Sequence, residues 1–164
     1  MSESLGVDLG NVIIDHVVFG TTPEFFQFGD YSTIPPVSRV FGALRYLNRK
    51  RFHGDIFVVY TASDVAEKKI LYWLESHSFF ERTGISPDRV RRTQNGRNKS
   101  SVCESYRATH FIDDRLEVLS HLVGKVKNLY LFRPQQKEIE PYQDFLIHVR
   151  LVTSWDEIVQ VLLP

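Results

Sequence analysis

Short, continuous apolar runs alternate along this chain with segments whose apolar residues recur every three or four positions. The clearest run, Ile56 to Tyr60, has no charged position and predicts a strand that is covered on both faces. Strands are expected at residues 5–7, 56–60, 90–93, 111–112 and 128–132, and helices at 36–50, 65–77, 99–106, 115–123 and 155–163. Because strands that alternate with helices pair in parallel through right-handed crossovers, the sequence predicts a three-layer α/β domain with a mainly parallel central sheet.

The composition indicates one globular unit without strong electrostatic partners. The chain has 164 residues, 43% of them hydrophobic, and 20 basic residues balance 20 acidic ones. We therefore expect a single domain over residues 1–164 with no general attraction to nucleic acid or anionic lipid. The single cysteine, Cys103, excludes an internal disulfide and a multi-cysteine zinc site. No signal-peptide pattern and no membrane-spanning apolar run is present, so we expect a cytoplasmic protein with no membrane partner.

Carboxylates follow two of the predicted strands, far apart in the sequence. Asp8 ends the first apolar run, and Asp113 with Asp114 ends the fourth. In an open parallel sheet the carboxyl ends of the strands share one edge, where ligands bind. An unpaired buried charge is costly, so three acids at this edge need a compensating cation. A divalent metal ion is the simplest such cation.

Two further polar residues are expected at the same edge. Thr61 follows the second strand, and Lys99 begins the helix that precedes the fourth. Three carboxylates, a hydroxyl and an ammonium group suit phosphoryl transfer, which needs a nucleophile, cations and oriented donors. An aspartate can be the nucleophile and form an aspartyl-phosphate, while Mg²⁺ prefers carboxylate and water oxygens. Ser63 is expected to cap the next helix instead of binding a ligand.

These residues, in this order, resemble the motifs of the haloacid dehalogenase superfamily of hydrolases. The matching segments are Asp8-Leu9-Gly10-Asn11-Val12, Val59-Tyr60-Thr61, Lys99 and Phe111-Ile112-Asp113-Asp114-Arg115. The resemblance covers residues 5–131 and implies a Rossmann-like fold. The Ile-Asp-Asp-Arg ending also resembles, more narrowly, the deoxyribonucleotidase branch of the family.

The resemblance assigns a metal site and a nucleophile. It implies that Asp8 is both the nucleophile and a metal ligand, and that Asp113 and Asp114 hold magnesium. The main-chain carbonyl of Gly10 would be a further ligand.

The resemblance also assigns the phosphate-binding groups. Thr61 would bind a phosphate oxygen, and Lys99 would neutralise the charge that develops during catalysis. We add Asn11 to the phosphate-binding residues. The resulting hypothesis is a magnesium-dependent phosphatase that acts on a phosphorylated substrate, either a small molecule or the end of a macromolecule.

One position departs from the family pattern. Phosphatases of this family usually carry a second aspartate, the general acid and base, two residues after the nucleophile, where this chain has Gly10. Because general acid–base help is worth about 100- to 10,000-fold, turnover is expected to be weak unless another residue substitutes. Asp15 is our candidate substitute, and His16 is its neighbour. The alternative hypothesis is a catalytically idle relative that binds a phosphorylated ligand or a protein partner.

The sequence leaves no room for a large cap domain between its motifs. Residues 19–36 carry turn residues together with aromatic ones, and they predict an aromatic-rich loop near the site. A missing cap implies an open site that suits a large substrate or closure by another subunit of an oligomer. The basic stretch 89–99 has two interpretations: a solvated edge, which we favour, or a surface that gathers a nucleic acid.

Overall fold

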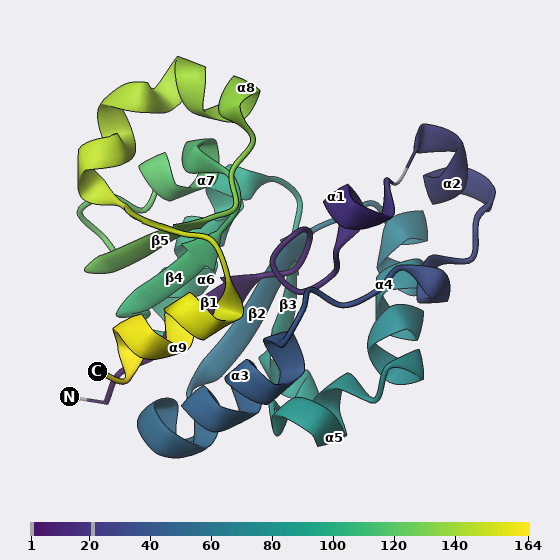
Figure 1. Ribbon diagram of the computed structural model, residues 1–164, viewed down its shortest axis with the longest axis horizontal. Helices are drawn as coiled ribbons and strands as arrows, with labels where there is room; N and C mark the ends of the chain where they lie inside the picture. Colours follow the sequence, from purple (N-terminus) through teal and green to yellow (C-terminus); the bar gives the residue numbers. More distant parts are fainter. Residues whose placement is uncertain (1, 21) are drawn as a thin grey trace.

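Six strands form one sheet in the part of the chain that the computed structural model describes, residues 2–20 and 22–164. They are β1 (Leu5–Asp8), β2 (Ile56–Thr61), β3 (Val90–Thr93), β4 (His110–Asp113), β5 (Asn128–Phe132) and β6 (Arg150–Val152). Their order across the sheet is β3-β2-β1-β4-β5-β6, and all neighbouring strands are parallel. The first strand of the sequence therefore lies inside the sheet, between β2 and β4 (Figure 1).

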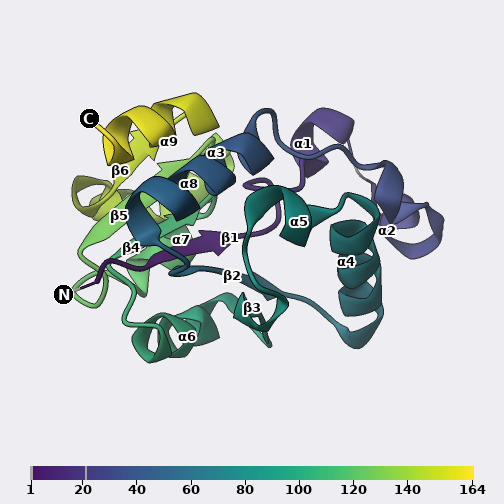
Figure 2. The same cartoon turned by 90° about the horizontal axis from the view of Figure 1, so that it is seen from below.

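Helical segments connect the strands. The α-helices are α1 (His16–Phe19), α2 (Pro23–Phe28), α3 (Val40–Leu47), α4 (Asp64–Ser76), α5 (Phe79–Thr83), α6 (Lys99–Ser105), α7 (Leu116–Ser120), α8 (Gln136–Ile139) and α9 (Trp155–Leu162). The 3₁₀ segments are η1 (Tyr31–Thr33), η3 (Pro87–Arg89), η4 (Gly96–Asn98) and η5 (Glu140–His148), and η2 (Asn48–Phe52) is a π-helical segment. Helices lie on both faces of the sheet, which confirms the three-layer α/β fold that the sequence predicts (Figure 2).

The two faces of the sheet have separate apolar cores, because successive strand residues point to opposite sides. Ile56 and Val58 of β2 pack with α3, α4, α5 and α9, where Trp73 and Trp155 are fully buried. Phe57 lies between these residues and belongs to the other core, with side chains of α6, α7 and η5. The run 56–60 is therefore apolar throughout because both faces of β2 are buried, as the sequence predicts.

Gly6 lets β1 lie in the middle of the sheet. A Cβ atom at this position would be 2.4 Å from Phe111 Cδ2 and 2.6 Å from Phe57 Cζ. These two rings, from β4 and β2, therefore meet over the glycine and bring both neighbouring strands into contact on that face.

The predicted helix over residues 36–50 is wrong at its start. Pro36 forms a bridge with Ile14, and the N–H of Val37 donates to Ile13 O at 2.7 Å. Arg39 then adopts a left-handed conformation, with φ of 69°, so α3 begins only at Val40. The segment after Asp8 thereby gains main-chain partners that a helix from residue 36 would not offer.

Residues 19–36, expected to be an aromatic-rich loop, instead contain two short helical segments. The Thr22 hydroxyl caps α2 by accepting from the N–H of Phe25, and the Asp30 carboxylate caps η1 by accepting from the N–H of Ser32. The part of this prediction that falls on Thr21, and on the side chain of Phe19, lies outside the described residues.

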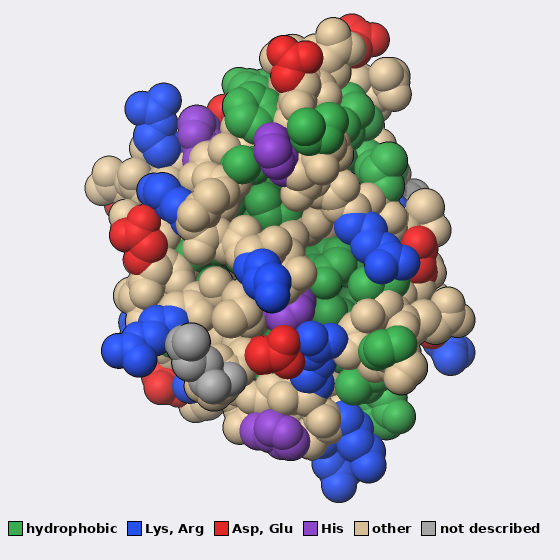
Figure 3. Space-filling view, turned by 90° about the vertical axis from the view of Figure 1, so that its left-hand side faces the viewer, with side chains coloured by type: hydrophobic (Ala, Val, Ile, Leu, Met, Phe, Trp, Pro, Cys, Tyr) green, Lys and Arg blue, Asp and Glu red, His purple; other side chains and the backbone are tan. Residues whose placement is uncertain are grey.

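Basic and acidic side chains are interspersed on the face that Figure 3 shows, in keeping with the balanced composition. Across residues 2–20 and 22–164, none of the helices combines the length and the apolar character that a membrane crossing requires.

Candidate functional site

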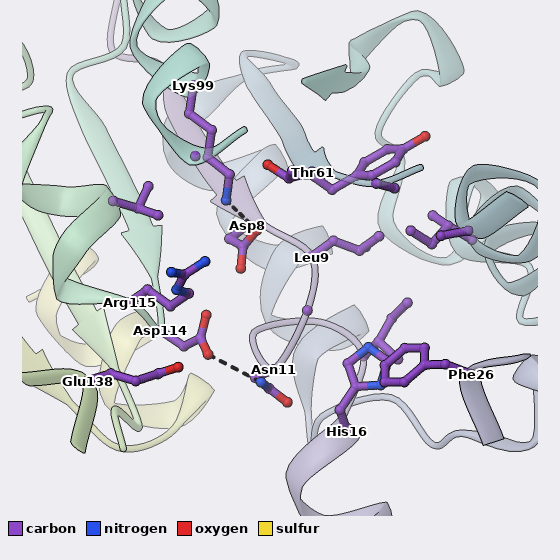
Figure 4. A pocket seen from close by; sticks show the side chains of 18 of the residues that line it. Asp8, Leu9, Asn11, His16, Phe26, Thr61, Lys99, Asp114, Arg115 and Glu138 are labelled. Carbon is purple, nitrogen blue, oxygen red and sulfur yellow. Dashed lines mark hydrogen bonds and ion pairs between the residues drawn. The ribbon is translucent and has the colours of Figure 1, made fainter. Parts of the chain in front are cut away.

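A pocket opens at the carboxyl ends of the central strands, where the sequence predicts the site. Its cavity volume is about 330 Å³. Polar side chains line one part of it and apolar or aromatic side chains another (Figure 4). The polar lining comprises Asp8, Asn11, His16, Thr61, Lys99, Asp114, Arg115 and Glu138, and the apolar lining includes Leu9, Ile14, Phe26, Tyr31, Tyr60, Ala62, Ala66, Ile70 and Val118.

Strands β1 and β4 end in carboxylates that lie close together in the structure. Ligand atoms of Asp8, Asp113 and Asp114 lie within 4.8 Å of one another, and all three residues are buried. Lys99, the first residue of α6, places its Nζ 2.6 Å from Asp8 Oδ1 and 2.9 Å from Asp113 Oδ2. One ammonium group thus joins the two strands whose carboxylates are distant in the sequence.

The pKa shifts reflect a shortage of positive charge in this cluster. Burial by itself would lower the pKa of Lys99, but the charges of Asp113 and Asp8 outweigh it and raise that pKa. Burial, together with the charge of Asp8, raises the pKa of Asp113 even though Lys99 opposes this. Burial and the charges of Asp8 and Asp113 also raise the pKa of Asp114. One ammonium group therefore does not compensate three buried carboxylates.

The donor set fits a hard metal ion. Three carboxylates converge with only one buried ammonium among the described residues that contact them. Asn11 Nδ2 donates to Asp114 Oδ2 at 3.2 Å, while Asn11 Oδ1 is buried and has no hydrogen-bond partner in the part of the chain that the structure describes. Oxygen-rich, negatively charged sites of this kind suit Mg²⁺ or Ca²⁺ in preference to softer metals. The cluster is consistent with a metal ion.

Local backbone geometry holds the carboxylates in place. The main-chain N–H of Arg115 donates to Asp113 Oδ1 at 3.0 Å, so both oxygens of Asp113 are bonded. Asn11 adopts a left-handed conformation, with φ of 61°, and its N–H donates to Ile14 O at 2.7 Å. This turn directs the Asn11 amide to Asp114, and the phosphate-binding role of Asn11 stays a prediction.

Thr61 lies in the pocket beside Lys99 and is joined to the neighbouring strand. Its Oγ1 lies 3.0 Å from Thr93 Oγ1, at the ends of β2 and β3. Thr93 is buried, and its hydroxyl also contacts the carbonyls of Tyr60 and Asn95. Thr93 is not among the predicted site residues, although it lies at the end of a predicted strand just as Thr61 does.

The imidazole of His16 lies close to the space that a side chain at position 10 would occupy. A Cβ atom on Gly10 would be 3.7 Å from His16 Cδ2 and 4.0 Å from Nε2. The Nε2 atom is 3.1 Å from the Tyr31 hydroxyl, and the imidazole packs against Phe26 with 5.2 Å between ring centroids. Burial lowers the pKa of His16, against the opposing charges of Asp15 and Asp8.

Asp15, our candidate substitute for the general acid and base, does not line the pocket. Its two oxygens accept from Arg133 at 3.1 and 3.3 Å, and the residue is buried. Among the described residues it is the neighbouring His16, and not Asp15, that lines the pocket. The structure thus separates Asp15 from the other predicted site residues.

Two charged pocket residues were not predicted. Arg115 follows the double aspartate directly, so its sequence position was a usable signal. Glu138 comes from α8, near Asp114 and Asn11 in Figure 4. Sequence position alone offers no signal for Glu138, because the fold of residues 133–148 determines where α8 lies.

Two arginines of the basic stretch 89–99 form ion pairs with residues outside the stretch. Arg89 pairs with Asp55 at 3.0 Å, and Arg92 pairs with Asp64 and Glu67 at 2.8 Å. The choice between a solvated edge and a surface that gathers a nucleic acid stays a prediction.

Comparisons with known proteins identify the fold. A scan of protein-family models found no match to this sequence, and a search of curated proteins found none either. Among solved structures, the chain is similar to the D,D-heptose 1,7-bisphosphate phosphatase of B. bronchiseptica in complex with magnesium and phosphate. The identity is 13%, the TM-score is 0.67, and the alignment covers 99% of this chain and 98% of the other.

Two other solved structures are comparably similar. A haloacid dehalogenase-like hydrolase from Burkholderia xenovorans LB400 has 15% identity and a TM-score of 0.65, with 98% of this chain and 96% of the other covered. A HAD family hydrolase from Deinococcus radiodurans R1, with bound phosphate and sodium, has 9% identity and a TM-score of 0.66, with 99% and 98% covered. At such identities the likeness establishes the fold alone: this chain has the fold of haloacid dehalogenase-like hydrolases. The narrower resemblance to deoxyribonucleotidases stays a prediction.

Proposed function

We propose that this chain is a magnesium-dependent phosphatase that hydrolyses phosphate monoesters through an aspartyl-phosphate on Asp8. The observation that carries the proposal is the cluster of Asp8, Asp113 and Asp114, bridged by Lys99 at the carboxyl edge of the sheet. The phosphatases among the structural neighbours have this fold, and one of them was crystallised with magnesium and phosphate.

Asp8 is the nucleophile in this proposal. An oxygen of its carboxylate attacks phosphorus, the bond from phosphorus to the leaving alcohol breaks, and an aspartyl-phosphate forms. Water then attacks phosphorus, the bond to Asp8 breaks, and inorganic phosphate leaves. Lys99 orients Asp8 through Oδ1, and its ammonium balances the charge that collects on the phosphoryl oxygens.

Asp8, Asp113 and Asp114 would hold the magnesium ion, with the carbonyl of Gly10 as the further ligand that the family resemblance implies. When bound, the ion would bring the anionic phosphate next to the anionic nucleophile and stabilise the charge of the transition state. Thr61, fixed to Thr93 at 3.0 Å, would donate to a phosphoryl oxygen.

The apolar part of the pocket suggests where the rest of the substrate lies. Phe26, Tyr31 and Tyr60 line it. A phosphate monoester whose alcohol carries a ring or another apolar group would place that group there.

The test is a screen of phosphate monoesters with and without Mg²⁺. We expect Mg²⁺-dependent release of phosphate from at least one compound, and loss of that activity in Asp8→Asn. Asp144→Asn, the same change at an exposed aspartate on η5, serves as the matched control. Equal rates for the wild-type protein and Asp8→Asn on every compound would sink the proposal.

One observation favours a second function. Gly10 offers no proton-transfer group to the pocket, so the chain could bind a phosphorylated ligand without turning it over. In that case Mg²⁺ and phosphate would raise the melting temperature while no substrate is hydrolysed.

A further inference from the structure

The proposed phosphatase needs a group that moves protons, and the carboxylate cluster does not provide one. The leaving oxygen must gain a proton in the first step, and the attacking water must lose one in the second. Asp8 is used as the nucleophile. Lys99 is bonded to two carboxylates at 2.6 and 2.9 Å and stays charged. The proton-transfer group must therefore come from elsewhere in the pocket lining.

Two of the remaining titratable side chains that line the pocket are candidates for this group. Arg115 keeps its proton under all ordinary conditions. Burial raises the pKa of Tyr60 to about 12 and also raises that of Tyr31, so both phenols keep their proton near neutral pH and neither can exchange one readily. This leaves Glu138 on α8 and His16 on α1.

The position of His16 matches the task. Because Gly10 has no side chain, the imidazole approaches the main chain two residues after the nucleophile, with Nε2 4.0 Å from where a Cβ atom of residue 10 would lie. The Tyr31 hydroxyl at 3.1 Å and the ring of Phe26 fix its orientation. Glu138, by contrast, lies beside Asp114 on the far side of the Asn11 turn (Figure 4).

We propose that His16 is the general acid and base of this site and that Tyr31 positions it, an inference that rests on the phosphatase function proposed above. As the phosphorus–oxygen bond to the alcohol breaks, the imidazolium of His16 gives its proton to the leaving oxygen. The neutral imidazole then takes a proton from the water that attacks the aspartyl-phosphate. Each turnover returns His16 to its starting state.

The test compares two leaving groups in the His16→Gln variant. An alkyl phosphate such as glycerol phosphate has a strongly basic leaving oxygen, whereas p-nitrophenyl phosphate leaves without a proton. We expect kcat/KM for the alkyl phosphate to fall by about 100-fold or more, and to fall at least ten times further than for the aryl phosphate. Tyr31→Phe should produce a smaller loss with the same preference.

A second readout follows the aspartyl-phosphate itself. Without a base for the attacking water, His16→Gln should release close to one equivalent of p-nitrophenolate per protein in a burst and then turn over slowly. A loss of structure would reduce both phases together, so the burst separates a chemical role from a structural one.

A third variant supplies a carboxylate at position 10 in place of the lost imidazole of His16. Adding Gly10→Asp to His16→Gln should recover hydrolysis of the alkyl phosphate, since a Cβ at position 10 meets only ordinary contacts. Glu138→Gln is the matched control and should leave the ratio of alkyl to aryl rates unchanged.

The outcomes distinguish a failure of the inference on His16 from a failure of the proposed phosphatase function. If both substrates slow equally in His16→Gln and no burst appears, or if Glu138→Gln alone changes the alkyl-to-aryl ratio, the inference on His16 is overturned while the phosphatase stands. If the wild-type protein hydrolyses no phosphate monoester, the phosphatase proposal fails and the inference falls with it.

Discussion

The Nζ atom of Lys99 lies 2.6 Å from Asp8 Oδ1, although 91 positions separate the two residues in the sequence. The pair joins the start of α6 to the end of β1, and Lys99 is only 4% exposed. It is therefore both an element of the proposed site and a buried contact between distant parts of the fold.

We expect Lys99→Met to destabilise the metal-free protein by about 3 kcal/mol at neutral pH, because it leaves buried carboxylates without their cation. The penalty should shrink as the pH falls and the carboxylates take up protons. Urea unfolding measures it. Lys125→Met is the matched control: Lys125 is about half exposed and pairs with Glu104 at 3.2 Å, so its loss should cost less than about 1 kcal/mol. Equal costs for the two variants would contradict the buried role of Lys99.

Mg²⁺ should raise the melting temperature, and by more at pH 8 than at pH 6. The raised pKa values of Asp113 and Asp114 mean that protons compete with the ion for these carboxylates. At 100 times its dissociation constant, the ion would stabilise the folded state by about 2.7 kcal/mol. Thermal melts with and without EDTA measure the shift. Asp114→Asn should abolish most of it, and a shift that survives in this variant would place the ion elsewhere.

The sheet and the carboxylate cluster were predictable because both follow from local patterns. The apolar run 56–60 and the boundaries of β3 and β5 needed only composition and turn residues. Once a parallel sheet is assumed, Asp8 and Asp113 must lie at one edge, and the structure has them there.

The positions of α3, His16 and Glu138 depend on contacts that no local pattern contains. A proline at position 36 is as compatible with a first helical turn as with the bridge it forms with Ile14. His16 and Asp15 are adjacent, yet Asp15 pairs with Arg133, 118 positions away, whereas His16 lines the pocket. Glu138 lies in the pocket because α8 packs against η5.

Replacing Gly6 by alanine should destabilise the protein by about 3 kcal/mol, whereas Gly42→Ala should stabilise it. A Cβ at Gly6 would be 2.4 Å from the ring of Phe111, inside a core that has no room to yield. Gly42 lies within α3, and nothing is within 4 Å of a Cβ placed there, so alanine should gain about 0.5–1 kcal/mol of helix propensity. Urea unfolding of both variants tests the contrast, and a similar effect of the two substitutions would contradict it.

The buried His110 should make the protein less stable in mild acid. Its Nε2 accepts from Arg51 Nη2 at 3.3 Å and Asn128 Nδ2 at 3.2 Å, so the ring is neutral and its Nδ1–H donates to Thr109 Oγ1 at 2.8 Å. Burial, together with the charge of Arg51, lowers the pKa of His110 from 6.5 to about 4.

Between these two pKa values the unfolded chain binds the proton more readily than the folded one. The contribution of His110 is therefore complete above pH 6.5 and is lost as the pH falls toward 4, at up to about 1.4 kcal/mol per pH unit. His110→Gln keeps an acceptor for Arg51 but does not titrate. We expect urea unfolding between pH 7.5 and 5 to show a flatter loss of stability in this variant than in the wild-type protein. Parallel pH profiles for the two proteins would mean that folding does not change the pKa of His110.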